Sequence, residues 1–135
     1  MKIQQFGSLM VAAAAIAVLT PHPVRADTIA LNSNLSAPIV RSGVSGGSNS
    51  SDCGFVPSGP NHRLTISQDF GSLQVQVQGG DGLTLKVSGP SGAFCIPVAN
   101  GVAQMPGYWP AGTYDIFVGD RANTQRNYQL VISTN

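Results

Sequence analysis

The chain of 135 residues contains no glutamate, and only 10% of its residues are charged. Among residues 27–135, five basic side chains stand against six aspartates, and Lys86 is the single lysine. Proteins bind nucleic acids and anionic membranes through concentrated positive charge. Because this sequence has no basic cluster, we expect neither of them as a partner.

Residues suited to catalysis are also scarce. His62 is the one histidine after residue 26, and its place between a Pro-rich segment and the first alternating segment indicates a surface position, not a Ser–His–Asp triad. The segment "GVSGG" (43–47) matches a hydrolase pattern, but the strand before it and the helix after it that the motif needs are not indicated. The six aspartates fall at expected turns or on outward strand positions, such as Asp115, which does not suit paired catalytic carboxylates. We predict a protein that is not an enzyme and uses no cofactor.

Residues 1–26 have the layout of a secretory signal peptide, with Lys2 at the start, the apolar run "SLMVAAAAIAVL" (8–19) and "VRA" at residues 24–26. The run is shorter than the ~20 residues of a membrane-spanning helix, which favours a cleaved signal over a membrane anchor. No cysteine stands directly after the apolar run, so a lipoprotein anchor is not indicated. We expect the mature chain to begin at Asp27 and to be periplasmic or secreted, without a membrane anchor.

Cysteine occurs only at Cys53 and Cys95. An even number of cysteines in an exported chain predicts a disulfide, and closing a loop of this length stabilises a fold by about 4 kcal/mol. The alternatives are two free thiols or a metal pair. No further Cys or His lies at ligand spacing, whereas zinc takes four ligands, so the sequence predicts a disulfide and no metal site.

Apolar and polar residues alternate strictly in five segments of the chain, which is typical of half-buried antiparallel strands. These segments are residues 63–67, 72–78, 82–88, 113–118 and 127–133. Turn residues separate them, and no window after residue 26 has helical periodicity. The pattern predicts an all-β chain that folds as an antiparallel β-sandwich over residues 61–135. Residues 27–60 are expected to form an N-terminal extension with a Gly/Ser-rich linker at 42–52.

The succession "LTIS…LQVQVQGGDGLTLKVSGPSG…C…WPAGTYDIFVGD…NYQLVIS" resembles the bacterial pre-peptidase C-terminal domain over roughly residues 61–134. The resemblance implies a jelly-roll-like sandwich, here as a small stand-alone exported version. Calcium-binding members carry two aspartates in the strand before the Pro-Ser-Gly turn, and the matching positions here are Gly82 and Thr84. Since calcium takes six to eight oxygen ligands, we expect no calcium site and interpret Asp81 as a residue of the turn.

Exposed aromatic residues are the remaining candidates for binding, because they stack on sugars and anchor protein partners. These candidates are Tyr108, Trp109 and Phe117. An alternative for Trp109 is that its side chain fills the core at one end of the sandwich. An alternative for Phe117 is that residues 28–40 fold over it and over Val131, and the sequence favours this covered arrangement. We predict an exported module that binds a protein or a glycan. A structural envelope protein without a ligand and a hydrolase are the alternatives, and the oligomeric state is not indicated.

Overall fold

A computed structural model describes residues 26–33 and 35–134, so the expected signal peptide lies outside the described residues except for its last position. Within these ranges the chain forms strands and no helix, which confirms the predicted all-β class. None of the described residues lies in a helix that is long and apolar enough to cross a membrane. The strands are β1 (Asp27–Leu31), β2 (Ile39–Val44), β3 (Asn49–Ser51), β4 (Gly54–Val56), β5 (His62–Ile66), β6 (Phe70–Gln78), β7 (Leu83–Gly89), β8 (Gly92–Pro97), β9 (Val102–Trp109), β10 (Gly112–Asp120) and β11 (Asn127–Thr134).

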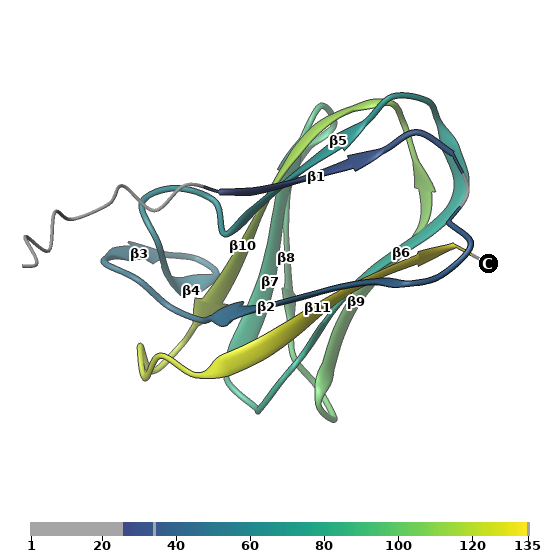
Figure 1. Ribbon diagram of the computed structural model, residues 1–135. Coiled ribbons are helices and arrows are strands. Elements are labelled where there is room, and N and C mark those ends of the chain that lie inside the picture. The colour runs from purple at the N-terminus through teal and green to yellow at the C-terminus, as the bar shows by residue number, and fades with distance from the viewer. Residues whose placement is uncertain (1–25, 34, 135) are drawn as a thin grey trace, which may run out of the picture.

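The strands form two sheets that face one another, as Figure 1 shows. In the large sheet, β10 pairs with β5, β7 and β4, and β1, β8 and β3 are the outer strands. The small sheet has the order β2-β11-β6-β9. All pairs are antiparallel except β1 with β5, which is parallel. The predicted antiparallel β-sandwich is therefore confirmed.

The core lies between the sheets and consists of the inward side chains of the alternating strands. Tyr128, Leu130 and Ile132 of β11 are buried, and Leu64 and Ile66 of β5 face them from the large sheet. Each large aliphatic side chain removed from water in this way contributes about 1.5–3 kcal/mol. This rigid core fixes the positions of the strand edges, where the exposed aromatic residues lie.

Residues 27–60 belong to the sandwich and do not form an extension outside it. Strand β1 pairs with β5 from Asp27↔His62 onward, and β2 pairs with β11. The expected linker at 42–52 instead contains the end of β2 and all of β3. These are outer strands with one unpaired edge, and polar residues, serine and glycine there weaken the alternation that marks inner strands.

The expected disulfide between Cys53 and Cys95 is present, with 5.7 Å between the Cα atoms. It joins the turn between β3 and β4 to the edge strand β8, which follows the "GPSG" turn. Cys53 is fully buried. The bond thus ties a short hairpin and an outer strand to the same sheet, where few apolar side chains hold them.

Candidate functional site

The unpaired edges of β8 and β9 meet on one side of the sandwich, and the aromatic residues gather there. Strand β8 ends the large sheet and β9 ends the small one. Phe94 of β8 is 46% exposed and Tyr108 of β9 is 63% exposed, which makes them two of the largest apolar surfaces in the described chain. Between them opens a cavity of about 130 Å³, which we call the aromatic pocket.

Trp109 is buried, with 2% of its surface exposed, so the expectation that its side chain forms an exposed contact is wrong. Its ring packs on Tyr114 with 4.9 Å between the ring centroids. Trp109 follows Ala103 and Met105 on the inward register of β9, where it pairs with Phe70 of β6. The alternative of a core residue is the correct one, and the ring also lines the aromatic pocket.

The floor of the aromatic pocket is held by Tyr114. Its hydroxyl donates a hydrogen bond of 2.7 Å to the carbonyl oxygen of Pro110. Its ring lies directly on Gly89, where a Cβ atom would come within 2.3 Å of the ring. Burial raises the pKa of Tyr114, with a smaller contribution from the charge of Asp69. Glycine at the start of the "GPSG" turn is therefore required by the aromatic packing.

The exposed rim residue Tyr108 is held in place by Asp69. The Tyr108 hydroxyl donates to Oδ2 of Asp69 over 2.8 Å, and the amide of Ala111 donates to Oδ1 over 2.7 Å. Both hydrogen bonds lower the pKa of Asp69, and the bond from the Ala111 amide has the larger effect. A ring that is oriented before binding loses less entropy when a partner arrives.

Phe117 lies apart from the aromatic pocket, on the outer face of the large sheet. It is half-buried there, and the ammonium of Lys86 lies 5.9 Å from the centre of its ring. The described residues of the segment 28–40 do not cover Phe117 and Val131 as expected, because β1 and β2 extend the two sheets at their edges. The structure therefore does not bring Phe117 together with Tyr108 and Trp109.

His62 is 3% exposed, so its expected surface position is wrong. Its Nδ1 lies 3.2 Å from Oδ2 of Asp27, and its Nε2 lies 2.7 Å from the hydroxyl of Tyr128. Burial is the main cause that lowers the pKa of His62, and the charge of Arg41 acts in the same direction, against the raising effect of Asp27. Neither hydrogen-bonding partner is a serine, so the imidazole joins the two sheets and does not activate a serine nucleophile.

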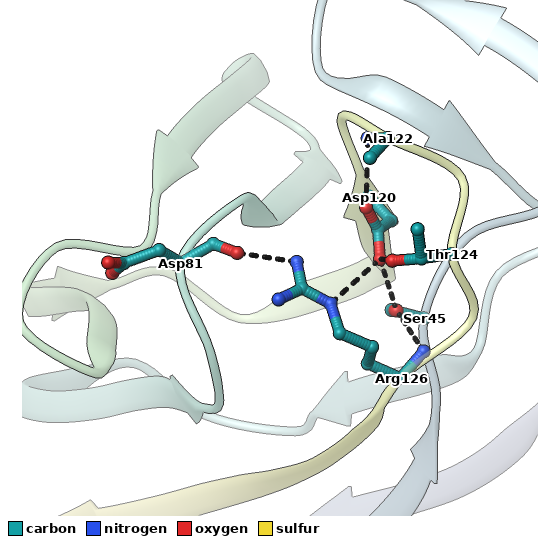
Figure 2. Close-up of polar contacts among 6 residues, drawn as sticks. All are labelled: Ser45, Asp81, Asp120, Ala122, Thr124 and Arg126. Atoms are coloured by element: carbon teal, nitrogen blue, oxygen red, sulfur yellow. Dashed lines mark hydrogen bonds and ion pairs between the residues drawn. The ribbon is translucent and has the colours of Figure 1, made fainter.

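The aspartates were expected at turns and on outward positions, and Asp120 is an exception, because it is fully buried. Its carboxylate accepts bonds from the Ala122 amide, the Thr124 and Ser45 hydroxyls and Nε of Arg126, at 2.9–3.3 Å (Figure 2). Burial alone would raise the pKa of Asp120, but these four hydrogen bonds outweigh it and lower the pKa. The cluster fixes the loop between β10 and β11. Ser45, the serine of "GVSGG", is part of it, with β2 before it and no helix after it.

Asp81 takes part in this region through its backbone. The guanidinium of Arg126 donates to the carbonyl oxygen of Asp81, and Figure 2 shows the Asp81 carboxylate directed away from Arg126. A Cβ atom at Gly80 or Gly82 would come within 3.0 Å of that guanidinium. In the part of the chain that the structure describes, no three His, Cys, Asp or Glu side chains form a group that could hold a metal ion. Arg126 thus fastens the Asp81 turn to the Asp120 cluster.

Comparisons with known proteins agree with this fold. The pre-peptidase C-terminal domain of collagenase from Bacillus anthracis superposes with a TM-score of 0.57 and 18% identity, over 83% of this chain and 98% of that domain. The fold is that of a pre-peptidase C-terminal domain, as the sequence resemblance implied. A periplasmic inhibitor of g-type lysozyme from Aeromonas hydrophila covers 82% of the chain at 15% identity, but its TM-score of 0.44 supports no functional conclusion.

No family model matches the chain. An uncharacterised protein of Synechococcus elongatus is 42% identical over 97 residues, which are 68% of this chain and 72% of that protein. The chain belongs to the same protein family as this cyanobacterial protein.

Proposed function

We propose that the chain is an exported, non-catalytic module that binds a protein partner through the aromatic pocket. The observation that carries the proposal is the exposure of Phe94 and Tyr108 around a cavity whose floor is Trp109 and Tyr114. Exposed aromatic residues that surround a small apolar hollow are typical of the centres of protein interfaces. The cavity of about 130 Å³ is close to the ~150 Å³ that holds one benzene molecule, so it suits a single apolar side chain.

Export is the second part of the proposal. Residues 1–26 have the composition of a signal peptide, and a disulfide such as Cys53–Cys95 persists in oxidising compartments. We expect the N-terminal sequence of the protein isolated from the periplasm or the medium to begin at Asp27. Cytoplasmic protein that retains residues 1–26 would contradict the proposal of export, but it would not affect the proposal that the aromatic pocket binds a partner.

The binding role is tested with a photo-reactive amino acid placed at Phe94 in cells that express the chain. We expect irradiation to yield a discrete covalent product of higher mass, because Phe94 is on the rim of the pocket. Thr65 is the matched control position, since it is also exposed and lies on the outer face of the large sheet. Absence of a product at Phe94, or equal products at both positions, would favour a structural envelope protein without a ligand.

A further inference from the structure

The small sheet has an unusual outer face. Its four strands contain one charged residue, Arg41, and Arg41 lies on the inward register, where it pairs with Asp27 at the sheet edge. The outward positions carry amides, hydroxyls and apolar groups, and Tyr108 of the aromatic pocket stands at the end of β9 on the same register. We call this surface the amide face. The outer face of the large sheet differs, because it carries the ion pair of Arg63 with Asp115 and also Lys86.

Amide side chains lie on three neighbouring strands of the amide face. Gln74 and Gln76 of β6 lie beside Gln104 of β9, and Gln78 of β6 pairs with Gln129 of β11. The Gln74 amide donates to the oxygen of Gln76 over 3.1 Å and to that of Gln104 over 2.7 Å. These bonds hold three amides in one arrangement before any ligand binds, which lowers the entropy lost on binding.

One end of the amide face is hollowed. An open depression of about 690 Å³ lies over the ends of β2, β6 and the start of β11. Its polar lining comes from Gln78, Asn127, Gln129 and Ser42, and Val44, which is 49% exposed, adds an apolar surface. The size falls within the ~300–1,000 Å³ of small-molecule sites.

We propose that the amide face binds a neutral polysaccharide. An amide offers both a donor and an acceptor, as does each sugar hydroxyl. The exposed side chains of Val40 and Val44 on β2 suit the apolar faces of sugar rings. An uncharged surface offers no attraction to nucleic acid, anionic lipid or a charged peptide. A second copy of the chain fits less well, because the core of a stable dimer interface is more apolar than this row of glutamines.

Affinity gels that contain soluble β-1,4-, β-1,3- or α-1,4-linked glucan test the proposal, with dextran sulfate as the charged counterpart. We expect at least one neutral glucan to retard the protein, with little change between about 0.05 and 0.5 M NaCl, because no ion pair forms. Gln76→Glu and, separately, Gln129→Glu should weaken binding by at least about tenfold, which is ~1.4 kcal/mol. Thr65→Glu, on the other sheet, should leave it unchanged.

Four results would overturn the proposal: no neutral glucan binds, only dextran sulfate binds, Thr65→Glu weakens binding as much as Gln76→Glu, or the face proves to be a dimer contact. The last would appear as concentration-dependent self-association that Gln76→Glu abolishes. Thermal melts of each variant separate loss of binding from loss of fold. Because Gln129 is exposed, its replacement should not disturb the fold. Phe94→Ser should leave glucan binding unchanged, so the proposal for the amide face and the proposal for the aromatic pocket are tested independently.

Discussion

Replacement of Trp109 by alanine should destabilise the fold strongly, whereas the same change at Tyr108 should not. Trp109 is 2% exposed and stacks against Tyr114, and truncation of such a ring to alanine costs about 3–5 kcal/mol in lost burial and cavity formation. For a domain of this size each kcal/mol lowers the Tm by roughly 4–8 °C, so the Tm should fall by at least about 12 °C. Tyr108 is 63% exposed and its hydroxyl bonds to an exposed carboxylate, so its loss should cost less than about 1 kcal/mol.

The assay is urea unfolding followed by far-UV circular dichroism, because Trp109 is the one tryptophan of the chain and its fluorescence disappears with the substitution. Trp109→Phe is the matched control, since it keeps an aromatic ring in the core and should lose much less stability than Trp109→Ala. A Trp109→Ala variant that unfolds within about 1 kcal/mol of the wild type would refute the placement of this ring in the core.

Three further predictions concern pH, the disulfide and calcium. His62 takes up a proton near pH 6.5 in the unfolded chain, whereas burial lowers its pKa in the folded chain. The free energy of unfolding should therefore fall as the pH drops from 7 through 6.5 to the pKa of the folded chain. A His62→Gln variant that keeps the same pH dependence of Tm would contradict this. Cys53→Ser with Cys95→Ser should lower the free energy of unfolding by about 2–5 kcal/mol, and an unchanged urea midpoint would count against the bond. Millimolar calcium should leave the Tm unchanged, because no aspartate stands at Gly82 or Thr84; a rise reversed by chelator would make Asp81 a ligand candidate again.

The sequence predicted the inner strands well, because their burial on one face imposes strict alternation. Each of the five alternating segments corresponds to one strand, and these strands are β5, β6, β7, β10 and β11. Strand β9 was not predicted, since Pro106 and Gly107 interrupt its pattern, and an edge strand tolerates both. The sequence does not predict the outer strands β1 and β2, because the unpaired edge of such a strand is solvated and carries polar residues.

The buried polar residues were missed for a different reason. Alternation continued to the strand ends would have placed His62 inward with Leu64, and Asp120 inward with Val118. Both are expected at the surface because they lie where a strand meets a Pro-rich or turn segment, and charged and polar side chains are seldom buried unless paired. Tyr128 lies 66 residues from His62, and Ser45 lies 75 residues from Asp120, although the other three partners of Asp120 follow it within six residues. Only the folded structure brings the distant partners to these side chains.

The aromatic pocket could be predicted only in part. The sequence singled out Tyr108 and Trp109, but the contributions of Phe94 and Tyr114 depend on how the edges of the two sheets meet. Phe94 belongs to β8, which has no alternating pattern. The pairing of Val87 with Phe94 in the large sheet sets its position on the pocket rim.

The most direct test of the proposed function measures occupancy of the aromatic pocket through Trp109, whose fluorescence reports on the floor of that cavity. Dodecapeptides selected from a random displayed library against the wild type, and depleted against Phe94→Ser, supply the probe. We expect the selected peptides to carry a large apolar residue, to shift the Trp109 emission on titration, and to bind at least about tenfold more weakly to Tyr108→Ser, a loss of ~1.4 kcal/mol. Phe117→Ser should bind like the wild type. If no peptide survives the depletion, or if those that survive leave the Trp109 emission unchanged, the aromatic pocket is not the binding site.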